Sequence, residues 1–183
     1  MIFNCLSYNL RSFNNKQFSG LNLLLNALSP DLIGLQHTGL KNPRLSEFKI
    51  LMKSKNYLMH NNPTTSRGEH AGMILLIKNR KDIKIYKARS VNSRLHYVKL
   101  QLNGEDFIIH NLYSYPRDTS INDIRALYDT ILTINAREGI DKNFIIMGDF
   151  NADINRISNV SRRDTLLKAV LSNNRWTQIS NPD

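Results

Sequence analysis

Residues 144–153 read FIIMGDFNAD. The apolar run Phe144–Met147 predicts a short buried strand that ends at Gly148. In an extended segment the side chains at positions i and i+2 point to the same side, so Asp149 and Asn151 are expected to project together from the strand's carboxyl end. The glycine before them allows close approach of another backbone or of a ligand. Gly, Asp and Asn also favour turns, so this stretch alone fits a turn as well as it fits a catalytic motif.

Polar residues follow three other expected strands in the same way. These segments are YNLR at 8–11, LQHT at 35–38 and NLYSYP at 111–116. Functional residues are commonly carried by loops that a rigid scaffold positions. The pattern therefore favours one site that is built by loops from several strands.

The rest of the chain predicts a mixed α/β protein. Apolar periodicity indicates the order β-α-β, then a series of strands, then α-β-α. Strands are expected at 2–8, 32–35, 73–77, 83–88, 95–102, 107–112 and 144–147, and helices at 17–28, 45–53, 121–136 and 164–171. Asn103-Gly104 is a strong hairpin signal. This order is typical of sheets with helices packed outside them.

Composition narrows the class of protein. The chain has 183 residues, of which 41% are hydrophobic and 22% charged, which suits one globular domain. The single cysteine, Cys5, excludes an intrachain disulfide, and no Cys/His cluster has zinc-finger spacing. No apolar run approaches a membrane span, and residues 1–13 lack the apolar region of a signal peptide. We expect a soluble intracellular protein with no membrane partner.

The net charge of +10 is unevenly distributed. Residues 1–100 carry 16 Lys/Arg and 4 Asp/Glu, whereas residues 101–183 carry 9 and 11. Eight of the cations lie between Lys78 and Lys99. Such a field attracts polyanions and predicts binding of DNA or RNA, although a solvated basic face would give the same count. The expected nucleic-acid contacts are Arg11, Lys78, Arg80, Lys81, Lys84, Lys87 and Arg89.

Five motifs in order carry a resemblance. They are SYNLRS at 7–12, DLIGLQHTGL at 31–40, AGMILLIKN at 71–79, HNLYSYP at 110–116 and IIMGDFNAD at 145–153. Together they resemble the endonuclease/exonuclease/phosphatase (DNase I-like) superfamily, closest in style to the endonuclease domains of non-LTR retrotransposons. The resemblance implies a four-layer α-β-β-α sandwich over residues 1–183 as a single domain. It also implies magnesium-dependent cleavage of a phosphodiester or phosphomonoester.

The resemblance assigns roles to four residues. Asn9 matches an asparagine that binds the metal or supports a metal ligand. Tyr113 matches a tyrosine that touches the substrate phosphate. Asp149 matches the residue that orients the attacking water, and Asn151 the one that binds the scissile phosphate.

One departure concerns the metal. The family's second-strand motif ends Gln-Glu-Thr, and its glutamate is the principal metal ligand, but this chain has His37 there. Mg²⁺ prefers oxygen ligands, whereas imidazole suits manganese, zinc or nickel better. His37 therefore indicates either a lost ligand or a retuned site. The expected cofactor is Mg²⁺ or Mn²⁺ near Asn9 and His37 if the protein is active, and none if it is a pseudoenzyme.

A second departure concerns the end of the sequence. The family continues past the GDxN strand to a Ser-Asp-His motif, whereas this sequence stops at Asp183, and none of its five histidines lies in such a motif. The sandwich is therefore expected to lack its C-terminal strands and to expose a sheet edge. A partner chain, self-association or a remodelled sheet would cover that edge.

Three functions remain open from the sequence. The first is a nuclease with an altered metal site or with a partner chain that completes the site. The second is an inactive, nuclease-derived protein that binds nucleic acid, alone or as a subunit of a larger assembly. The third is a degraded retroelement fragment without activity. A retroelement product would be expected in the nucleus.

Overall fold

The computed structural model describes residues 3–11, 14–40, 44–62, 72–116, 119–139 and 143–173. Within these residues the chain forms eight strands and four helices. The strands are β1 (Cys5–Asn9), β2 (Leu32–Gln36), β3 (Tyr57–Asn62), β4 (Met73–Lys78), β5 (Ile83–Asn92), β6 (Leu95–Leu102), β7 (Glu105–Tyr113) and β8 (Asn143–Asp149). The helices are α1 (Asn15–Leu28), α2 (Arg44–Ser54), α3 (Ile121–Glu138) and α4 (Arg162–Asn173).

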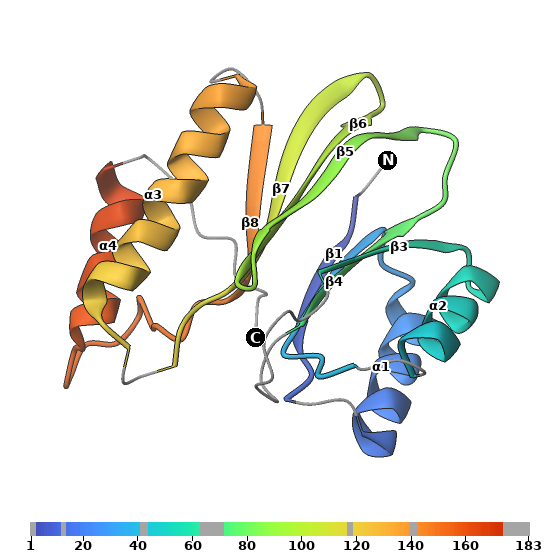
Figure 1. Cartoon of the computed structure of the whole chain (residues 1–183), viewed down its shortest axis with the longest axis horizontal. Helices are drawn as coiled ribbons and strands as arrows, with labels where there is room; N and C mark the ends of the chain where they lie inside the picture. The colour runs from blue at the N-terminus through green and yellow to red at the C-terminus, as the bar shows by residue number, and fades with distance from the viewer. Residues whose placement is uncertain are drawn as a thin grey trace.

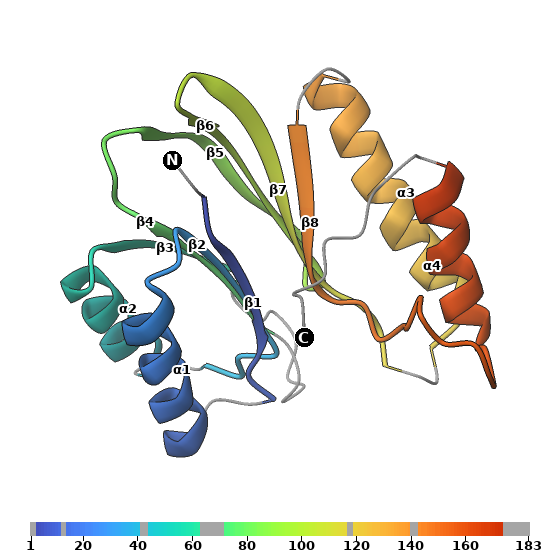
Figure 2. The same ribbon diagram turned by 180° about the vertical axis from the view of Figure 1, so that it is seen from behind.

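The strands form two four-stranded sheets. Their orders are β1-β2-β4-β3 and β5-β6-β7-β8. The pairs β1–β2 and β7–β8 are parallel, and the other neighbours are antiparallel. Helices α1 and α2 cover the outer face of the first sheet, and α3 and α4 cover the outer face of the second (Figures 1 and 2). The expected α-β-β-α sandwich is confirmed.

Three apolar layers hold the sandwich together. The middle layer joins the two sheets, with Leu75 and Ile77 from β4 packed in one cluster with Val98 and Ile109. On either side, the helices bury their apolar faces against the sheets. Burying one such large side chain contributes roughly 1.5–3 kcal/mol. The alternation within the strands thus fixes which side chains face the middle layer and which face the helices.

Local signals set the ends of the helices. The Asn14 side chain accepts a hydrogen bond from the Gln17 N–H and begins α1, and Ser29 ends it in the left-handed conformation. Ser120 caps the start of α3 in the same manner. None of the helices in the described part of the chain is long and apolar enough to span a bilayer.

Strand β3 was not predicted from the sequence. Its residues, YLMHNN, have only a short apolar run and end in two asparagines that favour turns. Pairing with β4 along its whole length supplies the order that local propensity lacks. The hairpin at Asn103-Gly104 is confirmed, since both residues have positive φ between β6 and β7.

The free edges of the two sheets meet. β1 and β8 each end their sheet and pair on one side only, within the residues that the structure describes. The two strands lie side by side (Figures 1 and 2). Because β2 is parallel to β1 and β7 is parallel to β8, the polar residues that follow these strands gather at one end of the sandwich.

Candidate functional site

Asn9 and Asp149 connect the two sheets. Asn9 is the last residue of β1 and Asp149 the last of β8. The Asn9 Nδ2 group donates to Asp149 Oδ2 over 2.5 Å, and Asn9 Oδ1 accepts from the Arg11 N–H at 2.9 Å. The Asp149 carboxylate is thus held from one side by an amide. The expected convergence of these two residues is present.

Tyr113 and His37 form the second contact across the site. The Tyr113 hydroxyl lies 3.2 Å from His37 Nδ1, and the two rings stack with centroids 5.5 Å apart. Which group donates depends on the tautomer of the imidazole. Tyr113 is the direct neighbour of Asp149 in the β7–β8 pairing. Asn9, His37, Tyr113 and Asp149, to which the resemblance assigned a role or a metal, therefore share one end of the sandwich.

The structure places Asn151 differently from the sequence-based expectation. An extended strand through residue 151 would place its side chain on the same side as Asp149, but β8 ends at Asp149 and Asn151 has φ 48°. The Asp149 side chain accepts the Asn151 N–H at 2.9 Å, which closes a tight turn. The Asn151 Nδ2 group instead reaches the Ser114 carbonyl at 3.2 Å. The turn, and not a strand, delivers Asn151 to the loop that follows Tyr113.

Gly148 permits the close approach that was expected of it. Its φ is 142°, and a Cβ atom there would lie 1.9 Å from the Leu112 carbonyl oxygen. No other residue type fits this position without moving β8 away from β7.

Arg94 is a site residue that sequence reasoning missed. It lies in the turn between β5 and β6, and its guanidinium carbon is 4.7 Å from the Tyr113 ring centroid and 5.1 Å from that of Tyr115. Its Nη1 donates to the Ser114 carbonyl at 3.3 Å. In the sequence Arg94 is one of eight cations, and only its place directly before an apolar strand distinguishes it. Stacking on two rings keeps this cation at the mouth of the site.

Two buried amides form the floor of the site. Gln36 and Asn111, which are 1% and 0% exposed, come from different sheets. The Gln36 Nε2 group donates to Asn111 Oδ1 at 2.7 Å, and the Asn111 Nδ2 group donates to the carbonyls of Leu35 and Ile74. A Cβ at Gly34 would lie 2.9 Å from Asn111 Oδ1, so a glycine is required beside this pair.

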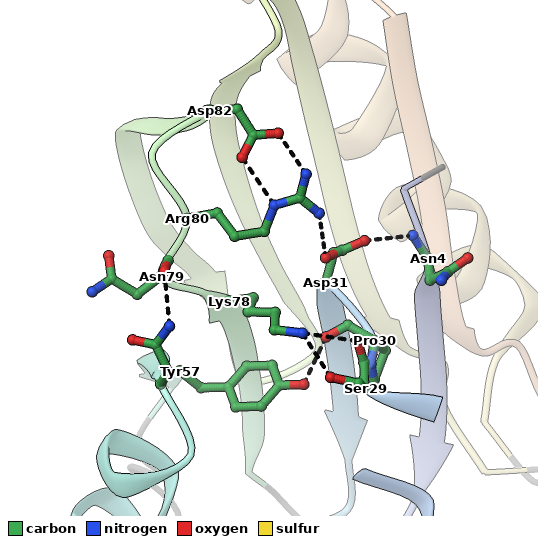
Figure 3. Close-up of polar contacts among 10 residues, drawn as sticks. Asn4, Ser29, Pro30, Asp31, Tyr57, Lys78, Asn79, Arg80 and Asp82 are labelled. Atoms are coloured by element: carbon green, nitrogen blue, oxygen red, sulfur yellow. Dashed lines mark hydrogen bonds and ion pairs between the residues drawn. The ribbon is translucent and has the colours of Figure 1, made fainter. Parts of the chain in front are cut away.

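The predicted nucleic-acid contacts do not form one group. Arg11 is exposed next to Asn9. Lys78 and Arg80 lie at the other end of the first sheet, beyond the start of β2. Figure 3 shows Arg80 between two carboxylates, Asp31 and Asp82, each 2.5 Å away, and Lys78 bonded to Ser29 at 2.6 Å. Hydrogen bonds to Asp82 and Asp31 raise the pKa of Arg80.

The remaining cations of that set lie along β5 and in the turn before it. Lys81, Lys84 and Arg89 are exposed. Lys87 is bound to Glu138 of α3 at 2.5 Å. β5 runs from residue 83, far from the site, to the turn that holds Arg94, a distance of roughly 30 Å. The charge at the Lys81 end is therefore remote from Tyr113.

The donor set can be compared with what a magnesium ion needs. Mg²⁺ prefers several oxygen ligands in octahedral geometry. Asp149 is the carboxylate of this site, and both of its oxygens accept hydrogen bonds from amides of the chain. Among the described residues, no group of three or more His, Cys, Asp or Glu side chains could hold a metal ion. The described residues at this site therefore do not by themselves supply the ligands that a magnesium ion needs.

Several solved structures have a similar fold. The fold is similar to the human Nocturnin catalytic domain with bound sulfate anion, with a TM-score of 0.71, 16% identity, and coverage of 94% of this chain and 70% of that chain. It is similar to the AP endonuclease LMAP from Leishmania major, with a TM-score of 0.70, 13% identity, and coverage of 94% and 66%. A third similar structure is the endonuclease domain of TRAS1, a telomere-specific non-LTR retrotransposon, with a TM-score of 0.66, 13% identity, and coverage of 94% and 71%.

These likenesses establish the fold. The chain spans only about half the length of TDP2 from Caenorhabditis elegans, covering 50% and 51% of that chain in two similar structures. None of the curated proteins matches the sequence. The profile of one family matches residues 6–181, which is most of the sequence. The chain belongs to the Endonuclease/Exonuclease/phosphatase family.

Proposed function

We propose that this chain binds a nucleic-acid strand and holds one of its phosphates between Arg94, Tyr113 and Asn151. The observation that carries this proposal is the convergence of three kinds of hydrogen-bond donor on the loop after β7. Arg94 stacks on Tyr113 and Tyr115, and Asn151 donates to Ser114 in the same loop. A guanidinium, a phenol and an amide are all groups that bind phosphate oxygens in nucleic-acid complexes.

The charge of the chain supports a polyanionic ligand. The net charge is +10, and the exposed cations Lys84 and Arg89 on β5 extend the positive field away from Arg94. The half-buried ring of Tyr115 adds a surface on which a base or sugar can pack. DNA and RNA both satisfy this chemistry, and comparing the two is part of the test.

Cleavage of the bound phosphodiester is the second candidate function. It is favoured by the Asp149 carboxylate, which Asn9 and the Asn151 N–H hold in a fixed orientation suited to a water molecule. The divalent metal that the family generally uses would supply charge compensation at the phosphate. Because the described residues do not provide the ligands, we propose that cleavage depends on a further carboxylate or on a partner chain. Such a partner, or a second copy, would add its strand to the free edges of β1 and β8.

Binding is tested by fluorescence anisotropy with labelled single-stranded DNA and RNA. Arg94→Ala is expected to weaken binding about tenfold or more, because a charged hydrogen-bond donor is removed. Lys81→Ala, at the far end of β5, is the matched control and should change the affinity little. Equal losses for the two variants would mean that binding depends on overall charge, and the site would not be where we place it.

A further inference from the structure

A cavity of about 600 Å³ opens beside Asn151. One wall is the loop before α3, including Thr119 and Ser120, and the other is the loop after β8, including Asn151 and Asp153. The floor is the first turn of α4, from Arg162 onward. The volume is in the range of pockets that take small ligands. Of the three residues proposed to hold the phosphate, only Asn151 lines this space.

Arg163 holds the first wall in place. Its guanidinium donates to the carbonyls of Tyr115 at 2.6 Å, of Thr119 at 3.3 Å and of Pro116. The residue is only 8% exposed. Three carbonyls from one loop thus satisfy a buried cation, which ties the segment after Tyr113 to the start of α4.

Asp164 holds the second wall. Its carboxylate accepts the N–H groups of Asp153 at 2.7 Å and Ser161 at 2.8 Å. These backbone hydrogen bonds lower the pKa of Asp164 to about 2. The segment after Asn151 is therefore tied to the same helix start. Adjacent residues of α4 fix both walls, so the cavity is built before any ligand enters.

An exposed cation lies at the rim of the cavity. Arg162, the first residue of α4, is exposed and has no hydrogen-bond or ion-pair partner in the part of the chain that is described. A cation at a helix start is unfavourable, because the helix dipole is positive there. Arg163 is stabilised at the helix start by its hydrogen bonds to the three loop carbonyls. Arg162 has no comparable contact among the described residues. Arg156, also in the lining, lies 3.7–3.8 Å from Asp164 and Asp153. Arg162 is thus an exposed cation in the lining of the cavity.

The cavity is continuous with the phosphate position through Asn151. Asn151 lines it and also reaches the loop that carries Tyr113. A ligand that reaches both Asn151 and the exposed Arg162 would be favoured by anionic groups repeated along a chain. A nucleic-acid strand has this pattern, and a phosphomonoester does not.

We propose that this cavity is the subsite for the nucleotide that flanks the phosphate held at Tyr113 and Asn151, and that Arg162 binds the next phosphate of the strand. This inference rests on the proposed function. It adds a prediction that phosphate binding alone does not make, namely that affinity increases stepwise when the ligand becomes long enough to reach Arg162.

The test is a competition assay in which unlabelled mono-, di- and trinucleotides displace a labelled strand from the whole chain. For the wild type, affinity should rise when the second phosphate is added. Arg162→Ala should reduce that gain about tenfold and leave mononucleotide binding unchanged. Arg125→Ala, an exposed arginine on α3 outside the cavity lining, is the matched control and should behave as the wild type.

The outcomes separate the two proposals. If Arg162→Ala weakens ligands of every length equally, or weakens none, the subsite is refuted while the proposed function stands. If the wild type binds ligands of no length, both are refuted. Thermal melting of each variant checks folding, and because Arg162 is an exposed cation at a helix start, its replacement should leave the melting temperature unchanged or slightly higher.

Discussion

Asn9 and Asp149, which are 140 positions apart in the sequence, are joined by a 2.5 Å hydrogen bond that links the free edges of the two sheets. This bond places a carboxylate next to the proposed phosphate position. A carboxylate opposes an anionic ligand, so its presence costs affinity unless it has another use, such as orienting a water molecule.

Asp149→Asn separates these two effects. Removal of the negative charge should strengthen binding of single-stranded nucleic acid by up to about fivefold, equivalent to about 1 kcal/mol. Any cleavage activity of the chain should fall about a hundredfold or more, because the carboxylate proposed to orient the water is lost. Anisotropy and a plasmid-nicking assay measure the two quantities. Weaker binding by this variant would show that Asp149 contacts the nucleic acid through a donor or an ion.

His37→Glu tests whether the histidine at position 37 is the reason that the site fits magnesium poorly. The substitution adds a carboxylate beside Tyr113, at the end of the sandwich that carries Asp149, and Mg²⁺ prefers such oxygen ligands. We expect magnesium-dependent cleavage to rise roughly a hundredfold above the wild type and to vanish with a chelator.

His37→Gln is the control for that experiment, since it offers a similar size without charge. An equal rise in both variants would mean that loss of the imidazole, and not gain of a ligand, is responsible. No rise in either would show that the site lacks more than this one carboxylate, as the partner-chain proposal requires.

Gly148→Ala should be much more destabilising than Gly104→Ala. Both glycines have positive φ, but a Cβ at 148 would overlap the Leu112 carbonyl, while one at 104 meets nothing within 4 Å. We expect a loss of at least about 3 kcal/mol at Gly148 and about 1–2 kcal/mol at Gly104, where only backbone strain applies. Urea unfolding measures both. Similar losses would contradict the close approach of β8 to β7.

The stability of the protein should fall as the pH drops from about 6.5 to about 4. Burial lowers the pKa of His96 and of His110 to about 4, and His60, near His96, has a pKa that burial also lowers. Below the ordinary histidine pKa the unfolded chain takes up protons that the folded chain does not, so the free energy of unfolding decreases. Each of the two rings should contribute up to about 3 kcal/mol over this range.

His96→Leu tests that account by unfolding at pH 7 and at pH 4.5. The variant should lose less stability between these values than the wild type does. An unchanged difference would assign the pH dependence to other groups. Asp164, whose pKa is lowered to about 2, affects the free energy of unfolding only below about pH 4. Its protonation there weakens the hydrogen bonds that hold the loop after Asn151.

Much of the fold followed from local patterns, and the exceptions have physical causes. The apolar runs and helical periodicities predicted every helix and seven of the eight strands within the described residues, because those segments bury one face. β3 depends on pairing with β4, which no short window of sequence contains. The basic residues between 78 and 99 looked like one continuous positive surface in the sequence. In the structure, Arg80 is paired with two carboxylates, and the side chains along β5 alternate in exposure, so these cations do not form one surface.

The site was predicted less completely than the fold. Motif order brought Asn9, Tyr113 and Asp149 to one end of the sandwich, where the structure places them. The left-handed turn at Asn151 and the stacking of Arg94 depend on residues far away in the sequence, so spacing could not indicate them. The same holds for the start of α4, where Arg163 and Asp164 have their partners in two other loops.

The Gln36–Asn111 pair beneath the site has a consequence for how the protein can change. Its groups are neutral amides whose bonding is complete inside the sandwich, so neither acidity nor ionic strength should loosen it. The residue directly after Gln36 can therefore be exchanged, histidine for glutamate or the reverse, without shifting the strands that support it. The side chains that follow the strands can therefore vary while the pair beneath them keeps its hydrogen bonds.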